Sequence, residues 1–176
     1  MDVKTQSQKI SLLSVLDSGG LKDRLNNLIV DSMKDPLDRF NMGYDYIRLV
    51  KDLDHDYNNE RYIINLESST YPEDMGYLNI RKHHQDRACS LSFYLMKEYR
   101  NQGILTGLVD FIGTRCFQQL GYNRISAECT SLNKPALKIY RVLLKEEGVR
   151  REASYYNSQY VDVHEFGILK RESKFK

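Results

Sequence analysis

The stretch from residue 89 to residue 120 constrains the fold most, because it joins three different local patterns. Residues 90–96 are mostly apolar and β-prone, which predicts a strand. A charged turn with Arg100 and Gly103 follows, and beyond it apolar residues recur at helical spacing. These apolar residues are Leu105, Leu108, Val109, Ile112, Cys116 and Leu120. The predicted order is therefore strand, glycine-containing turn and amphipathic helix.

This order suits the binding of a phosphate group. The first turn of a helix directs several backbone N–H groups, and the positive end of the helix dipole, at one place. Gly103 has no Cβ, so the backbone can approach an anion closely there, and Arg100 adds a positive charge nearby. An ordinary connection between a strand and a helix, with a surface arginine, explains the same stretch equally well.

A second strand and helix follow downstream. Residues 124–130 read as a strand, and residue 134 begins a short helix. Asn133 is a good N-cap for that helix, and Pro135 suits its first turn, where the missing N–H is harmless. The face expected to be buried comprises Ala136, Ile139, Tyr140 and Leu143.

Together these two patterns resemble the GNAT superfamily of acetyl-CoA-dependent N-acetyltransferases. The matching motifs are Arg100-x-x-Gly103 and Asn133-x-x-Ala136-x-x-Ile139-Tyr140. The tail at residues 147–163 resembles the RimJ/RimL-type branch, and residues 35–40 resemble its N-terminal pattern faintly. The likeness covers roughly residues 74–171.

The resemblance implies an α/β (α+β) fold, with one GNAT-like domain over residues 1–176. We expect a central mixed, mostly antiparallel sheet flanked by helices. The strands at 90–96 and 124–130 are expected to start side by side and splay apart, which leaves a V-shaped slot. Sequence patterns predict further strands at 9–15, 61–66, 75–81, 155–156 and 160–169, helices at 21–33 and 44–53, and turns at 72–74, 82–87 and 157–158.

The resemblance also implies acetyl-CoA as co-substrate and no metal. Its pyrophosphate would lie at the turn and helix start, and its pantetheine arm would pair with the edge of the first splayed strand. Asn133 would hydrogen-bond the arm, Ala136 would keep its helix close, and Lys138 would reach the phosphates. The cofactor-binding residues expected are Phe93, Tyr94, Leu95, Arg100, Asn101, Gln102, Gly103, Ile104, Leu105, Thr106, Asn133, Ala136 and Lys138.

Tyr140 matches the family tyrosine that, in many members, protonates the departing thiolate. A phenol has a pKa of about 10 and a thiol one of about 8.5, so a phenol can return the proton. Without the resemblance, a core aromatic residue on its helix is the simpler interpretation. The sequence identifies no general base.

We therefore expect an N-acetyltransferase that acts on a primary amine. The RimJ/RimL likeness favours a protein N-terminal amine, and a polyamine, an amino sugar or an aminoglycoside stays open. A non-catalytic module that binds acyl-CoA is the rival hypothesis. It rests on Leu105, where the family has a small residue, and on Leu144 and Lys145, which replace the usual Gly-Phe.

The composition limits the class of protein. The 176 residues carry 26 basic and 24 acidic side chains, a net charge of +2, which gives no support for nucleic-acid or membrane binding. The three cysteines lack zinc-ligand spacing and lie in apolar segments, so we expect reduced thiols and a cytoplasmic protein. Tyr155, Tyr156 and Tyr160 could form a homodimer contact, although burial under neighbouring elements explains them equally well.

Overall fold

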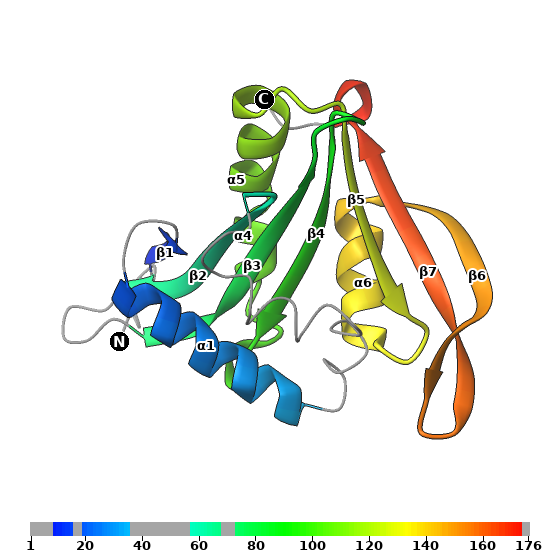
Figure 1. The fold of residues 1–176 in the computed structure, drawn as a ribbon, viewed down its shortest axis with the longest axis horizontal. Helices are drawn as coiled ribbons and strands as arrows, with labels where there is room; N and C mark the ends of the chain where they lie inside the picture. The colour runs from blue at the N-terminus through cyan, green and yellow to red at the C-terminus, as the bar shows by residue number, and fades with distance from the viewer. Residues whose placement is uncertain (1–8, 16–18, 36–56, 68–72, 174–176) are drawn as a thin grey trace, which may run out of the picture.

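The computed structural model describes residues 9–15, 19–35, 57–67 and 73–173. Within them, one seven-stranded sheet has the order β1-β2-β3-β4-β5-β7-β6 (Figure 1). The strands are β1 (Lys9–Ser14), β2 (Asn59–Glu67), β3 (Glu73–His83), β4 (Ala88–Leu95), β5 (Arg124–Thr130), β6 (Lys145–Tyr156) and β7 (Gln159–Leu169). Strands β4 and β5 pair in parallel, and the other neighbouring strands are antiparallel. The prediction of a mixed, mostly antiparallel sheet is confirmed.

Helices cover both faces of this sheet. They are α1 (Gly19–Lys34), α4 (Ile104–Gly107), α5 (Val109–Gly113), α6 (Lys134–Leu143), the π-helical segment η3 (Thr114–Gln119) and the short 3-10 helices η2 (Lys97–Tyr99) and η4 (Lys170–Glu172). Helix α1 crosses one face, which we call the α1 face, and α4, α5 and α6 lie against the other, the α6 face (Figure 1). In the described ranges, no helix combines the length and the apolar character needed to cross a membrane.

The strands alternate between two buried clusters, as half-buried strands do. The smaller cluster lies between α1 and the sheet. It includes Leu25, Leu28 and Ile29 of α1 and Ile63, Tyr77 and Tyr94 of the strands. The larger cluster lies under α4, α5 and α6 and includes Ile64, Leu78, Leu91, Leu95, Leu108, Ile112, Ile125, Ala127 and Phe166. Strand residues that alternate with members of the larger cluster therefore point to the α1 face.

The amphipathic pattern at residues 105–120 forms a helical segment, as predicted, but the helix is not continuous. It is interrupted at Leu108, between α4 and α5, and it ends in the π-helical segment η3. Gly107 precedes the interruption, and glycine weakens a helix by about 1 kcal/mol relative to alanine. The predicted face is still buried, since Leu105, Ile112 and Cys116 are each 7% exposed or less.

Strands β4 and β5 start as neighbours and then separate. Their pairing comprises three residue pairs and ends at Ser90 and Ser126. Beyond that point β4 continues to Leu95 and β5 continues to Thr130. We call the paired part the closed end and the separated part the open end of the split. The predicted splay is confirmed.

Gly76 allows β3 to pass unusually close to the end of β4. A Cβ added at Gly76 would lie 2.0 Å from the Tyr94 carbonyl oxygen, a distance that no side chain tolerates. The pairing of β2 with β3 also shifts beside Gly76, between Ile64 and Asn65. The backbone is therefore irregular at the open end, which is typical of β-bulges near functional sites.

Two predicted turns are wrong in their boundaries. Glu73 and Asp74 belong to β3, because they pair with β2. Lys82 and His83 also belong to β3, because they pair with the start of β4. In both cases the strand pairing extends further than the local sequence indicates. The predicted helix at residues 44–53 lies outside the described residues.

The turn and the second strand of the C-terminal hairpin agree with the prediction, but the first strand, β6, starts at Lys145, well before the predicted residues 155–156. Asn157 and Ser158 form its turn with φ values of 46° and 62°, which a two-residue hairpin turn favours. Helix α6 passes into β6 without a loop, since Leu144 is extended and Lys145 starts the strand. The missing Gly-Phe at this position is therefore accommodated by a direct connection.

Candidate functional site

A cavity of about 390 Å³ lies where the end of β4, the start of α4 and one side of α6 meet. All thirteen residues predicted to bind the cofactor line this cavity. They are Phe93, Tyr94, Leu95, Arg100, Asn101, Gln102, Gly103, Ile104, Leu105, Thr106, Asn133, Ala136 and Lys138. Residues 93–106 and 133–143 are distant in the chain, and the fold brings them together.

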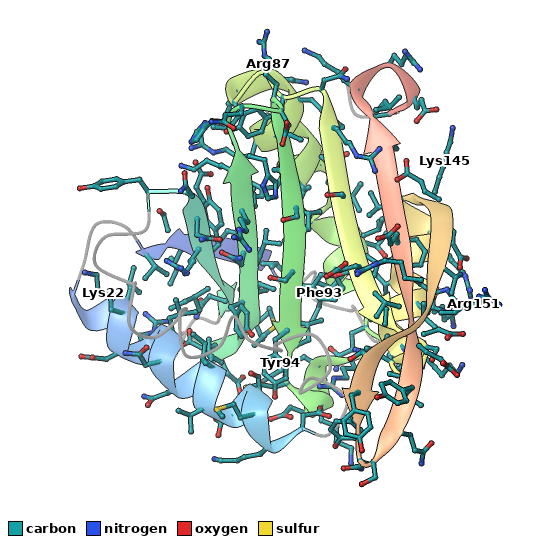
Figure 2. All side chains as sticks on the ribbon, turned by 45° about the vertical axis from the view of Figure 1, so that its right-hand side comes forward. Lys22, Arg87, Phe93, Tyr94, Lys145 and Arg151 are labelled. Carbon is teal, nitrogen blue, oxygen red and sulfur yellow. The ribbon has the colours of Figure 1, made fainter. Side chains whose placement is uncertain are left out.

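The open end of β4 forms one wall of the cavity. Phe93 is half-buried against the α6-face cluster, whereas the ring of Tyr94 lies under α1, 5.8 Å from the ring of Tyr77. Tyr94 therefore presents its backbone to the cavity. Figure 2 shows Phe93 and Tyr94 toward the open end of the split, with Arg87 at the closed end. A strand edge without a neighbour offers backbone groups to an extended ligand.

The turn before α4 has the conformation that its glycine predicts. Gly103 is the N-cap of α4 with a φ of 76°, and Asn101 also has a positive φ of 62°. A Cβ at Gly103 would meet nothing within 4 Å, so the backbone conformation, and not crowding, requires glycine there. The first N–H groups of a helix have no acceptor within it, and here these belong to Ile104, Leu105 and Thr106.

Arg100 lines the cavity, but its charge is engaged within the protein. Its Nε donates to the Leu95 carbonyl at 2.9 Å, and its guanidinium donates to the Asp35 carboxylate at 2.5 Å. The guanidinium also lies over the Tyr94 ring, 5.8 Å from its centroid. Arg100 thus ties the end of β4 to the residue after α1. Arg100 brings its charge to the cavity paired with a carboxylate, and its contact with a phosphate stays a prediction.

The start of α6 forms the opposite wall. Asn133 caps the helix, because its side-chain oxygen accepts a hydrogen bond from the Ala136 N–H at 3.1 Å. Asn133 and Ala136 are 4% and 5% exposed, so they border the cavity from within the core. Lys138 is exposed at the edge of the cavity. The predicted N-cap is confirmed, and a contact of Asn133 with a cofactor arm stays a prediction.

Tyr140 is buried beside the cavity and is not one of the described residues that line it. Its ring lies 5.3 Å from that of Phe93 and 5.5 Å from that of Phe166, and the residue is 2% exposed. This packing matches a core aromatic residue. Phe93, which contacts Tyr140, lines the cavity, and a role of Tyr140 in proton transfer stays a prediction.

Five further residues line the cavity without having been predicted as cofactor-binding. They are Tyr99, Pro135, Ile139, Val142 and Leu143. The helical periodicity of α6 already indicates Ile139 and Leu143, whereas no sequence signal indicates Tyr99. Burial, a hydrogen bond to Glu73 and the charge of that carboxylate raise the pKa of Tyr99 to about 12. The Tyr99 hydroxyl is therefore protonated at neutral pH.

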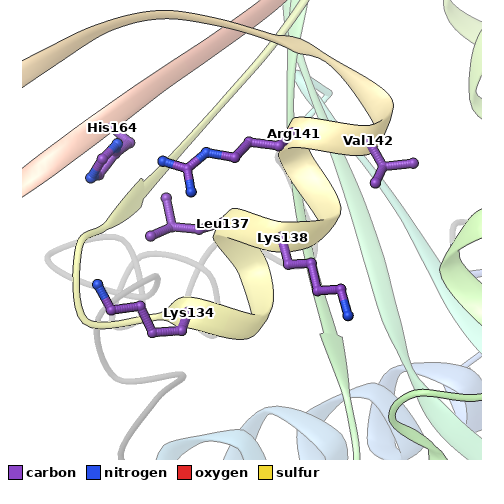
Figure 3. A pocket seen from close by; sticks show the side chains of 6 residues that line it. All are labelled: Lys134, Leu137, Lys138, Arg141, Val142 and His164. Carbon is purple, nitrogen blue, oxygen red and sulfur yellow. The ribbon is translucent and has the colours of Figure 1, made fainter.

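A second, more open depression of about 530 Å³ lies on the outer side of α6, toward β7 (Figure 3). Lys134, Lys138 and Arg141 contribute positive charge to it. Glu146 neutralises part of that charge, since it accepts from Arg141 at 2.9 Å and contacts His164 at 2.5 Å. No group of three or more His, Cys, Asp or Glu side chains in the described residues is placed to hold a metal ion.

A family model and a curated relative match parts of this chain. The model of the acetyltransferase (GNAT) family matches residues 26–143. The putative ribosomal N-acetyltransferase YdaF of Bacillus subtilis (strain 168) is 28% identical over 89 residues, which are 49% of this chain and 48% of that protein. The chain thus matches about half the length of this curated relative.

Solved structures share the fold over most of the chain. The spermidine N-acetyltransferase of Vibrio cholerae in complex with CoA and spermine has a TM-score of 0.73 and 18% identity, covering 93% of this chain and 96% of that one. A structure described as a probable acetyltransferase has a TM-score of 0.70 and 20% identity, covering 93% and 94%. At this identity the likeness concerns the fold.

Proposed function

Because this chain belongs to the acetyltransferase (GNAT) family, we propose that it transfers the acetyl group of acetyl-CoA to a primary amine. The observation that carries this proposal is the split between β4 and β5 beside the 390 Å³ cavity. The volume lies within the usual range of small-molecule sites, about 300–1,000 Å³. The family prediction is confirmed, and the weak match to YdaF favours the RimJ/RimL-type branch.

The residues present fit coenzyme A. The turn from Asn101 to Gly103 and the first N–H groups of α4 suit the pyrophosphate, which needs several donors. The open edge of β4 at Phe93 to Leu95 suits the amide-rich pantetheine arm. Ile139 and Leu143 supply an apolar wall. When bound, acetyl-CoA supplies the activated thioester.

This chain's own residues would position the reactants and handle protons. The two walls of the cavity orient a thioester relative to an amine, and orientation alone can lower a barrier by several kcal/mol. We propose Tyr140 as the acid that returns a proton to the thiolate. Its support is its family position and its contact with Phe93, which lines the cavity.

The acceptor that we propose first is a protein N-terminal amine. The resemblance of the tail at residues 147–163 and the match to the ribosomal N-acetyltransferase favour it. A polyamine is the second candidate, since the solved neighbours include a spermidine N-acetyltransferase bound to spermine. Amino sugars and aminoglycosides have no comparable support.

Two measurements test the proposal. Calorimetric titration with CoA reports binding, and thiol release from acetyl-CoA reports turnover with an alanyl tetrapeptide amide, spermidine, glucosamine or kanamycin. We expect CoA binding and turnover with at least one amine. No binding at millimolar CoA would overturn the proposal.

A non-catalytic acyl-CoA-binding module remains the alternative, and the burial of Tyr140 favours it. CoA binding without turnover on any amine would support that reading. The structure weakens its original basis, because Leu105 is 7% exposed and packs into the core, and Leu144 joins α6 directly to β6.

Three further expectations stay predictions. They are a single domain over residues 1–176, a cytoplasmic location and a homodimer. For the last, Tyr155 and Tyr160 are exposed by 63% and 67% at the end of the β6–β7 hairpin, with ring centroids 4.9 Å apart. Such aromatic pairs are common in interfaces.

A further inference from the structure

The depression on the outer side of α6 is a second concave surface, on the far side of that helix from the split. Its volume of about 530 Å³ lies within the usual range of small-molecule sites. Its floor is apolar, because Leu137 is 3% exposed and packs into the α6-face cluster. Figure 3 shows Lys134, Arg141 and His164 around Leu137 on this side of α6. The depression thus combines an apolar floor with a basic rim.

Glu146 orients the arginine of this rim. Its carboxylate accepts from Arg141 Nε at 2.9 Å and from Arg141 Nη2 at 3.4 Å, and it contacts His164 Nδ1 at 2.5 Å. The His164 side chain is 14% exposed and stacks on Phe166, with ring centroids 6.4 Å apart. Arg141 Nη1 makes no hydrogen bond to the residues that the structure describes. Arg141 is therefore oriented and keeps a donor for a ligand.

The charges of the depression favour a phosphate group. Lys134 is exposed and makes no hydrogen bond or ion pair within the described ranges. Lys134, Lys138 and Arg141 bring three positive charges, against the one negative charge of Glu146. A carboxylate ligand would need the fork of Arg141 that Glu146 already occupies, whereas a phosphate also binds lysine as a point charge. A phosphate therefore fits the remaining donors better than a carboxylate does.

A ridge joins this depression to the cavity beside the split. Lys138 and Val142 line both, and Val142 is 71% exposed on the ridge between them. A phosphate monoester can reach the depression from two sources. Coenzyme A carries one, the 3′-phosphate of its adenosine, at the end away from the thioester, and that end would cross the ridge. A separate small phosphate ester would enter from solvent.

We propose that the depression on the outer side of α6 binds a phosphate monoester between Lys134 and Nη1 of Arg141, with the organic part of the ligand over Leu137. Glu146 is a positioning residue, because it acts through Arg141. The monoester is the 3′-phosphate of CoA or a separate nucleoside monophosphate. The first source rests on the proposed acetyltransferase function, and the second does not.

The first experiment compares CoA with dephospho-CoA, which lacks the 3′-phosphate, by calorimetric titration of wild type, K134Q, R141Q and K145Q. Lys145 is the matched control, because it is exposed, binds Glu172 at 2.8 Å and does not line the depression. If CoA is the source, wild type should bind CoA about tenfold tighter than dephospho-CoA. That preference should fall to about threefold in K134Q and below about twofold in R141Q, where Glu146 is left uncompensated, and should persist in K145Q.

The second experiment titrates AMP, with adenosine as the uncharged control, into protein saturated with dephospho-CoA. If a separate ester is the source, AMP should bind and adenosine should not, and R141Q should weaken AMP binding at least fivefold.

Three results would overturn this inference while the acetyltransferase function stands. They are no preference for CoA together with no binding of millimolar AMP, a preference or AMP binding that R141Q leaves unchanged, and an equal loss in K145Q. A wild-type protein that binds neither CoA nor dephospho-CoA would overturn the acetyltransferase function, and AMP titrated into the unliganded protein would then still test the depression.

Discussion

The two ends of the split use the same strands for different purposes. At the closed end, β4 and β5 pair backbone to backbone, and Ser126 Oγ adds a bond to the Cys89 carbonyl at 3.2 Å. At the open end, the Leu95 carbonyl is instead held by the side chain of Arg100. Pairing consumes backbone groups for stability, whereas separation leaves them for a ligand. The split therefore gives up part of the sheet's pairing and leaves backbone groups of β4 and β5 without a strand partner on that side.

The closed end is also less exposed to solvent than the open end. Cys89, Cys116 and Ile125 are completely buried there, whereas Asn101, Gln102 and Gly103 at the open end are exposed. A hydrogen bond with Cys89 and burial raise the pKa of Cys116, so this thiol is neutral and fills the core. Substitutions at the closed end should affect folding alone, and those at the open end should also affect CoA binding.

Gly76→Ala should have the largest effect, because it acts where β3 supports the open end. The added Cβ would lie 2.0 Å from the Tyr94 carbonyl oxygen and push the strands apart. We expect a loss of about 3 kcal/mol in the free energy of unfolding, measured by urea denaturation, and weaker CoA binding. Gly107→Ala is the control, since its Cβ would meet nothing within 4 Å. Equal losses of unfolding free energy in Gly76→Ala and Gly107→Ala would contradict the close approach of β3 to β4.

Glu60→Gln tests the attachment of the helical segment near the closed end. The Glu60 carboxylate binds the guanidinium of Arg115 in η3 at 2.7 and 2.8 Å and accepts from Tyr62 at 3.0 Å. We expect a loss of about 2 kcal/mol at pH 7, with the Kd for CoA unchanged. A shift in that Kd would show that the two ends are coupled.

The same variant should alter the acid sensitivity of folding. Burial opposes ionisation, but bonds from Arg115 and Tyr62 outweigh it and hold the pKa of Glu60 below the ordinary value of 4.5. A lowered folded-state pKa gives stability that is present above pH 4.5 and lost as the pH falls through the folded-state value. The unfolding free energy of Glu60→Gln should therefore fall less steeply below pH 4.5 than that of wild type. If the unfolding free energies of the variant and of wild type fall equally with pH, the Glu60 carboxylate is not a source of the acid sensitivity.

Arg100→Lys should loosen the open end by a smaller amount. Lysine cannot bind the Leu95 carbonyl and the Asp35 carboxylate together in the fork geometry of arginine. We expect about 1.5 kcal/mol less stability and a Kd for CoA several-fold higher. Asp35→Asn and the double variant complete a thermodynamic cycle. Additive losses would mean that the two side chains do not cooperate.

Gly103→Ala should have the smallest effect on folding, since an alanine at a φ of 76° costs about 1 kcal/mol. Its Cβ would project into the open space of the cavity, so CoA binding should weaken more than stability does. Asn101→Gly is the matched control, because it relieves a positive φ in the same turn. A larger loss of stability than of CoA affinity would contradict a role for this turn in binding.

Local sequence patterns predicted much of the secondary structure, because each of these features depends on residues that are close in the chain. The αL conformation at Gly103 follows from the absence of a Cβ, and the cap at Asn133 follows from a side chain that reaches an N–H three residues ahead. The alternation of Ala127 and Glu128 follows from strand geometry. The family motif added the splay and the thirteen cavity residues, which periodicity alone does not indicate.

Contacts between distant residues decided the rest. Arg100 is neutralised by Asp35, which lies 65 positions away, and no nearby residue signals that pairing. Tyr140 is enclosed by Phe93 and Phe166, which arrive from β4 and β7. The amino-acid order thus determined which segments become strands, caps and turns, since those depend on neighbours in the chain. Which charges remain available, and which aromatic rings reach the cavity, depended on packing between strands that only the folded chain brings together.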